Sequence, residues 1–251
     1  MRVQYCSDLH LEFEQNERHL REKPLKVSGD VLVLAGDIAP LEEKYFQHPF
    51  FGFCADNYQQ VYWIPGNHEF YHQDLSTYPA AYNIKLKNNL SLVNNVSVLH
   101  DDVLFAFTTL WSKINALKNP DIEQRVADFV CINLNNKKLR IADFNALHAN
   151  SLAFLTDTLQ LQSRKTVVVT HHLPSPQCNF PAHNFSPINE AFCVDITDFI
   201  AKSQANFWIY GHSHFNQRPL VIGKTMLLTN QLGYLALHEH KHFKRNAYFA
   251  V

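Results

Sequence analysis

The sequence predicts a single α/β domain that spans residues 1–251. Two observations point to this class: short apolar segments recur along the whole chain, and helix-like amphipathic stretches lie between them. Short, near-continuous apolar runs are typical of strands covered on both faces, as in sheets flanked by helices. No Gly/Ser-rich or Pro-rich linker and no internal repeat divides the chain, so one domain is expected.

Several predicted strands end abruptly in a cluster of polar residues. These strands are Arg2–Cys6, Asp30–Ala35, Val61–Ile64, Thr166–Val169 and Asn206–Tyr210. Two further segments are predicted to be hairpins: Val96–Leu110 around Asp101-Asp102, and Leu220–Leu228 around Gly223. Because α/β sheets place ligands beyond the carboxyl ends of their strands, the polar clusters mark the expected site.

Two helices are predicted from apolar residues at helical spacing. They cover Asn145–Ser163 and Ile188–Lys202, with Asn189 as the N-cap of the second. The segment Lys113–Arg140 has the weakest pattern, and we expect loops or short helices there, lying over the site. His238-Glu239-His240-Lys241-His242 could chelate a metal, but its charged neighbours favour a solvated turn before the last strand.

Composition narrows the class of protein. The chain has 46% hydrophobic residues, enough for a packed core without disulfides or a structural metal. Its 22 Lys and Arg balance 23 Asp and Glu, which argues against a protein whose whole surface binds a polyanion such as nucleic acid but leaves a local basic patch open. Five cysteines without a CxxC pair indicate reduced, buried thiols. Acidic residues follow the N-terminus closely and no apolar run reaches ~18 residues, so we expect a cytoplasmic protein without a membrane span.

Fifteen histidines are unusual, and several stand in the polar clusters. The clusters supply seven possible ligands: Asp8, His10, Asp37, Asn67, His171, His212 and His214. Carboxylates, an amide oxygen and imidazoles without cysteine suit Mn²⁺, Fe²⁺, Zn²⁺ or Co²⁺ in an open site. Seven ligands exceed the needs of one catalytic ion but fit two ions that share a carboxylate. Gly36, Gly66 and Gly211 would let the backbone turn sharply beside the ions.

The ordered series of motifs resembles the calcineurin-like metallophosphoesterase superfamily. The motifs are Asp8-Leu9-His10, Gly36-Asp37, Gly66-Asn67-His68-Glu69, Thr170-His171-His172 and Gly211-His212-Ser213-His214. The resemblance implies a four-layer sandwich of two mixed β-sheets flanked by helices, with a dinuclear site at the strand ends. It also implies one ion held by Asp8, His10 and His214, a second held by Asn67, His171 and His212, and Asp37 as the bridge.

The resemblance further implies a mechanism. Two divalent ions (Mn²⁺, Fe²⁺/Fe³⁺ or Zn²⁺) would clamp the phosphate, and a bridging hydroxide would attack phosphorus in line. His68 would protonate the leaving group or bind phosphate; the alternative is a loop histidine bonded to backbone. His171 is preferred as ligand because it follows the strand directly, which leaves His172 to support it or to face substrate. Trp111 could line the substrate pocket or fill the core.

One departure from a related group of enzymes bears on the substrate. In the protein Ser/Thr phosphatases an Asp and an Arg follow the Gly-Asp motif, but Gly36-Asp37-Ile38-Ala39-Pro40 contains neither. The carboxylate that orients His68 is therefore unidentified, and a protein substrate is disfavoured. We expect hydrolysis of a small phosphodiester or phosphomonoester, with the diester favoured. The alternatives are a non-catalytic scaffold, which the retromer subunit of the superfamily resembles, and a nuclease.

Overall fold

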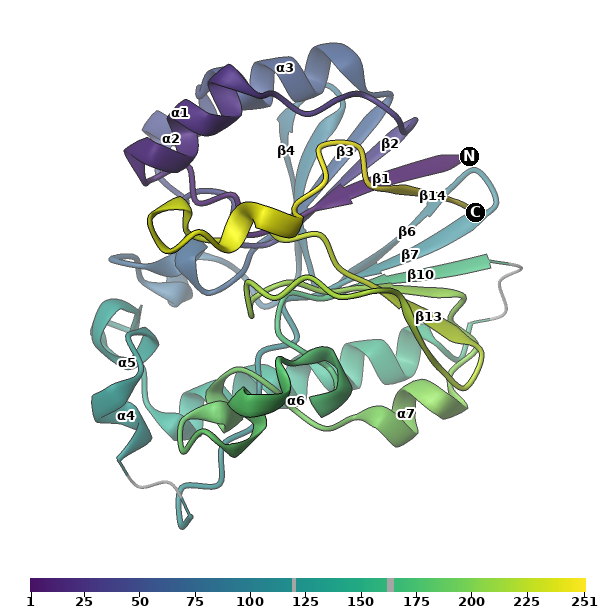
Figure 1. The fold of residues 1–251 in the computed structure, drawn as a ribbon. Coiled ribbons are helices and arrows are strands. Elements are labelled where there is room, and N and C mark those ends of the chain that lie inside the picture. Colours follow the sequence, from purple (N-terminus) through teal and green to yellow (C-terminus); the bar gives the residue numbers. More distant parts are fainter. Residues whose placement is uncertain (119–120, 162–164) are drawn as a thin grey trace.

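The computed structural model describes residues 1–118, 121–161 and 165–251. Two six-stranded mixed sheets face each other, and helices cover their outer faces (Figure 1). This arrangement is the predicted four-layer α/β sandwich. Within the described ranges, no helix is both long enough and apolar enough to cross a membrane.

The first sheet has the strand order β14-β1-β2-β3-β5-β4. Its strands are β1 (Arg2–Cys6), β2 (Val31–Ala35), β3 (Gln60–Ile64), β4 (Tyr82–Lys87), β5 (Leu90–Asn94) and β14 (Tyr248–Ala250). The four central strands β1, β2, β3 and β5 run parallel, and the edge strands β14 and β4 are antiparallel. The loops after β1, β2 and β3 therefore emerge at one edge.

The second sheet has the strand order β12-β13-β11-β10-β7-β6. Its strands are β6 (Val96–His100), β7 (Val103–Phe107), β10 (Lys165–Val169), β11 (Phe207–Ile209), β12 (Leu220–Ile222) and β13 (Thr225–Leu228). The central strands are again parallel. Both predicted hairpins, β6–β7 and β12–β13, are confirmed as antiparallel pairs.

Alternating residues of the central strands fill two different layers of the core. Val33 of β2 and Val167 of β10 point into the layer between the sheets. Leu32 packs under the helices α1 (Glu14–Glu22), α2 (Glu43–Phe46) and α3 (Pro49–Asn57). Val168 packs under α6 (Ile141–Thr158) and α7 (Thr197–Lys202). The strands are apolar on both faces because both faces are covered.

The five predicted strands are confirmed, but the helices differ from prediction. The first predicted helix is α6, which ends at Thr158; its predicted end at Ser163 lies outside the described residues. The prediction of one helix over Ile188–Lys202 is wrong. Asn189–Ala191 form a 3-10 turn and only Thr197–Lys202 are α-helical. Leu173 exchanges backbone hydrogen bonds with Phe192 and Val194, which holds this stretch extended.

The weakly patterned segment forms short elements, as expected, although residues 119 and 120 lie outside the described ranges. It contains α4 (Ile122–Arg125), α5 (Asp128–Cys131), β8 (Asn133–Leu134) and β9 (Lys137–Lys138). The cysteines are free; Cys131 is partly exposed and the other four are buried.

Candidate metal centre

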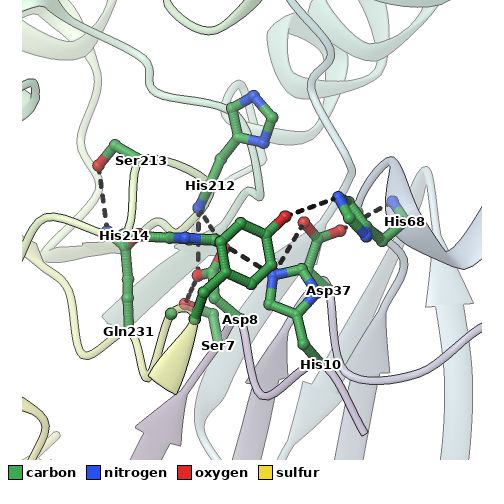
Figure 2. A network of polar contacts seen from close by, with 12 residues as sticks. Ser7, Asp8, His10, Asp37, His68, His212, Ser213, His214 and Gln231 are labelled. Carbon is green, nitrogen blue, oxygen red and sulfur yellow. Dashed lines mark hydrogen bonds and ion pairs between the residues drawn. The ribbon is translucent and has the colours of Figure 1, made fainter. Parts of the chain in front are cut away.

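The predicted ligands meet at the carboxyl ends of parallel strands from both sheets. The loops after β1, β2 and β3 bring Asp8, His10, Asp37 and Asn67, and the loops after β10 and β11 bring His171, His212 and His214. Figure 2 shows Asp8, His10, Asp37 and His214 gathered at one place. The amide of His212 donates to Asp8 Oδ1 at 3.0 Å, which ties the two sheets together there.

The backbone at these positions adopts a conformation that costs energy. Five of the seven predicted ligands have a positive φ: Asp8 (56°), His10 (48°), Asp37 (54°), His212 (78°) and His214 (52°). Left-handed conformations of residues other than glycine cost ~1–3 kcal/mol each and cluster at functional sites. The surrounding packing must therefore fix these loops in place.

Glycine is required at two positions beside the ligands. Gly36 has a φ of +88°, and a Cβ there would lie 2.3 Å from Nδ1 of His171. A Cβ on Gly66 would lie 2.2 Å from Oδ1 of Asp37 and 2.6 Å from Nε2 of His171. The predicted role of these glycines, close approach of backbone to the site, therefore has a direct steric basis.

The ligand atoms form two groups that share one carboxylate. Asp8, His10, Asp37 and His214 each offer an atom within 4.8 Å of the others. Asp37, His171 and His212 do the same. The amide oxygen of Asn67 lies 3.2 Å from Nε2 of His171 and so belongs with the second group. The structure thus brings together all seven predicted ligands, with Asp37 common to both groups.

Facing imidazole nitrogens show that cations fit this site. Nε2 of His10 lies 3.0 Å from Nε2 of His214, and Nε2 of His171 lies 3.1 Å from Nδ1 of His212. The other ring nitrogens of His10, His171 and His214 contact Glu12, the carbonyl of Ala35 and Glu239. When His10, His171 and His214 are neutral, those nitrogens carry the protons and the other nitrogen of each ring presents a lone pair to the site. A divalent ion between them would satisfy both.

The electrostatics also favour cations. Burial lowers the pKa of His171, but the Asp37 carboxylate outweighs it and raises that pKa to about 9. Burial also acts against His214, while hydrogen bonds to Asp8 and Glu239 raise its pKa to about 10. Burial acts to raise the pKa of Asp37, yet the charges of His171 and His68 hold it well below the usual range. Without metal, protons on His171 and His214 balance the negative charge of the nearby carboxylates. Two bound cations would supply that positive charge instead.

Three supporting carboxylates were not predicted from the sequence. Glu12 contacts Nδ1 of His10, and Glu239 contacts Nδ1 of His214 at 2.6 Å. Asp128 accepts a hydrogen bond of 2.8 Å from the Asn67 amide nitrogen, which turns the amide oxygen toward the site. Such partners fix the tautomer and orientation of metal ligands. The segment predicted as a solvated turn is instead a 3-10 helix over Glu239–His242, and the Glu239 carboxylate contacts His214 rather than solvent alone.

Glu69 holds the loops after β2 and β3 together. It is fully buried, and its carboxylate accepts hydrogen bonds from Asp37 N (2.8 Å), Ile38 N (2.7 Å), Gly66 N (2.6 Å) and the Trp63 indole (2.9 Å). Burial and the Asp37 charge raise the pKa of Glu69 to about 7. Glu69 stands in the Gly66–Glu69 motif, but the sequence did not predict that this carboxylate joins the two loops.

His68 lies beside the ligand groups and faces a cavity. Its amide donates to Oδ1 of Asp37 at 2.9 Å (Figure 2). Its ring stacks on Tyr71 with centroids 4.1 Å apart, and Nε2 lies 3.2 Å from the Tyr234 hydroxyl. The ring therefore bonds to side chains, whereas the alternative considered from the sequence was a histidine bonded to backbone.

His172 and Trp111 are placed in the interior. His172 is fully buried, and neither ring nitrogen has a hydrogen-bond partner within the described part of the chain. Its ring packs 4.2 Å from His212 and 5.3 Å from Trp111, centroid to centroid. Trp111 is buried in the core, where its ring packs against Phe70 and Phe144 with centroids 6.0 Å and 5.4 Å away. Neither residue is among the described residues that line the cavity at the ligand groups.

That cavity has a volume of about 420 Å³ and continues outward from the ligands. Asp37, Asn67, His68, His212 and His214 form its inner end. The rest of its wall is apolar at Val126, Ala127, Ile188, Ala191 and Phe192, and polar at Arg125, Asn179, His183 and Asn189. A site with two groups of metal ligands at its base can therefore admit a small molecule.

Residues 1–216 match the sequence model of the calcineurin-like phosphoesterase family, and the chain therefore belongs to that family. The family and the paired ligand groups together define a metal-dependent phosphoesterase, a hydrolase of ester bonds that uses two divalent metal ions.

Individual proteins also resemble this chain in sequence or in fold. The chain is 31% identical over 275 residues to an uncharacterised protein of Acanthamoeba polyphaga mimivirus, covering 99% of this chain and 96% of that protein. Phosphopantetheinyl hydrolase (PptH) from Mycobacterium tuberculosis superposes with a TM-score of 0.73 at 17% identity, covering 97% of this chain and 93% of that one. A dimetal phosphatase from Danio rerio superposes with a TM-score of 0.43 at 13% identity, covering 92% and 87%. The likeness to phosphopantetheinyl hydrolase shows a shared fold.

Proposed function

We propose that this protein hydrolyses a small phosphoester, with a phosphodiester favoured over a monoester. The observation that carries the proposal is the pair of ligand groups that share Asp37 at the base of an open cavity. One ion would be held by Asp8, His10 and His214, the other by Asn67, His171 and His212, with Asp37 between them. Two ions in such a site neutralise charge on the phosphoryl oxygens and acidify a water for in-line attack.

The chain's own residues position the substrate and supply a proton. Asn67 and His68 line the cavity next to Asp37, so both can reach a phosphate bound there. Nε2 of His68 is directed toward the Tyr234 hydroxyl, 3.2 Å away, and Tyr234 also lines the cavity. From this position His68 would give a proton to the leaving oxygen as the phosphorus–oxygen bond breaks.

The outer part of the cavity supports a substrate larger than phosphate. Ile188 and Phe192 offer an apolar wall that can hold an ester substituent. Arg125 also lines the same cavity. These features favour a diester with one substituent on the apolar wall. No observation here favours a protein substrate, and the cytoplasmic location and the lack of a nucleic-acid partner stay predictions.

Hydrolysis of bis-p-nitrophenyl phosphate with Mn²⁺ tests the proposal. Asp37→Ala removes the shared carboxylate and is expected to abolish turnover, whereas the control Asp56→Ala changes an exposed aspartate of α3 and should leave it intact. Near-wild-type turnover by Asp37→Ala would sink the proposal. A panel of mono- and diesters, including phosphopantetheine after the name of the structural neighbour, then ranks substrates.

Two alternatives are separated by further outcomes. A non-catalytic scaffold predicts fewer than about one bound ion per chain after Mn²⁺ reconstitution. A nuclease predicts cleavage of single-stranded DNA that weakens as salt rises. The complete ligand set and the ordered His68 argue against the scaffold.

A further inference from the structure

One carboxylate connects the predicted ligand His10 to the predicted acid His68. Oε1 of Glu12 lies 3.0 Å from Nδ1 of His10 and 3.1 Å from Nδ1 of His68. The Glu12 side chain is only 16% exposed. The two rings pack edge to face with centroids 4.5 Å apart. Among the described residues, Glu12 is the one carboxylate within ion-pair distance of the His68 ring.

The hydrogen-bonding chemistry of Glu12 fixes both tautomers. An ionised carboxylate can only accept, so Nδ1 of each histidine must carry the proton. Nε2 of His10 is then a lone pair, and it lies 3.0 Å from Nε2 of His214 in the first ligand group. Nε2 of His68 faces Tyr234 and the cavity. In the imidazolium form of His68 this nitrogen carries the second ring proton, which is the one available to a leaving oxygen. Each ring therefore turns its Nε2 as the proposed function requires: that of His10 toward the first ligand group, and that of His68 toward the cavity.

We infer that Glu12 is a positioning residue that sets the orientation of His10 toward the first ion and of His68 toward the leaving group. This inference rests on the proposed function. It assigns to Glu12 the orienting task for which Gly36-Asp37-Ile38 offers no second carboxylate. Retention of an ion and donation of a proton thus depend on the same side chain.

A different role for these three residues is less consistent with the geometry. His10, Glu12 and His68 each offer an atom within 4.8 Å of the others and could themselves surround an ion. His10 would then bind one ion through Nδ1 and another through Nε2, which requires an imidazole stripped of both protons. The orienting role needs only the neutral ring.

The first test measures metal binding rather than activity. Glu12→Gln keeps the size of the side chain and removes its charge, and Glu14→Gln, at an exposed position two residues on, is the matched control. Titration of metal-free protein with Mn²⁺ should show that Glu12→Gln binds one of two ions ~10–100-fold more weakly. The control should bind both ions as the wild type does.

The second test compares leaving groups at saturating Mn²⁺. Nitrophenol is a far stronger acid than phenol, so nitrophenolate leaves with little need of a proton. Glu12→Gln should therefore lower kcat for diphenyl phosphate by ~10-fold or more beyond its effect on bis-p-nitrophenyl phosphate. His68→Gln should show the same selective loss, and the double variant should add no further selective loss, because both changes remove one function.

The inference is overturned by an unchanged affinity for both ions, by a third ion per chain, or by equal losses on the two esters. Circular dichroism and thermal unfolding of the metal-free variants confirm that they fold. If the wild type hydrolyses neither ester, the proposed function fails, while the Mn²⁺ titration still decides whether Glu12 orients His10.

Discussion

The buried carboxylate of Glu69 offers a quantitative test of how the metal loops are held. Each of its oxygens accepts two N–H donors: Oε1 from Ile38 and Trp63, Oε2 from Asp37 and Gly66. In Glu69→Gln an NH₂ group replaces one oxygen, so two donors lose their acceptor whichever way the amide turns. A hydrogen bond to a charged group contributes ~1.5–3 kcal/mol, so the loss of two amounts to ~3–6 kcal/mol.

The cost of ionising Glu69 in the interior opposes the loss of hydrogen bonds, so it decides where in the range of ~3–6 kcal/mol the destabilisation should fall. Burial and the Asp37 charge raise the pKa of Glu69 to about 7, which shows that ionising this group in the interior is costly. The neutral amide avoids that cost, so we expect the lower end, ~3 kcal/mol. For a domain of this size, 1 kcal/mol corresponds to ~2–4 °C in Tm, so the expected drop is roughly 6–12 °C.

Calorimetry at pH 8.5 in EDTA measures this drop without a contribution from bound metal. At that pH the carboxylate of the wild type is ionised in both the folded and the unfolded state, since the pH lies above about 7. Glu14→Gln, at an exposed position, should shift stability by less than ~0.5 kcal/mol. A Tm of Glu69→Gln within about 1 °C of the wild type would show that these four hydrogen bonds do not stabilise the loops after β2 and β3.

Two further predictions concern the close approach at Gly66 and the thiols. Gly66→Ala should lower kcat/KM at least ~100-fold, because its Cβ would displace Asp37 and His171, whereas Gly52→Ala, with nothing within 4 Å, should retain activity. Equal activity of the two variants would contradict the steric argument. Cys131 is the partly exposed thiol, so one of the five thiols should react quickly with a disulfide reagent in the native chain and all five in denaturant. Two or more rapidly reacting native thiols would show that the interior opens.

The meeting of the seven candidate ligands was predictable because each of them stands in a short motif that follows a strand. Asp8 and Asp37 follow β1 and β2, and parallel strands bring their carboxyl ends to one edge of the sheet. The parallel order of the strands is therefore enough to bring the loops that follow them together. The local sequence was therefore sufficient to predict both the strands and the set of residues that meet.

The supporting residues were not predictable because their partners are distant in the chain. Glu12 stands two residues after the first motif, but its contact with His68 spans 56 positions. Asp128 comes from a segment without a clear pattern, and its bond to Asn67 spans 61 positions. Neither contact leaves a periodic or spacing signal in the sequence.

The helix predicted over Ile188–Lys202 shows a related limit. Its apolar residues have helical spacing, yet Phe192 and Val194 bond to Leu173, which follows β10. A non-local backbone pairing therefore overrides the local preference. It also places Ile188 and Phe192 on the wall of the cavity, where an unbroken helix was expected.

Anomalous diffraction from crystals soaked in Mn²⁺ shows directly whether two ions share Asp37. Two peaks are expected ~3.5–4 Å apart, both in contact with Asp37. One peak should be bounded by Asp8, His10 and His214, the other by Asn67, His171 and His212. A single peak, or two peaks of which one lies away from Asp37, would contradict the shared-carboxylate site on which the proposed function rests.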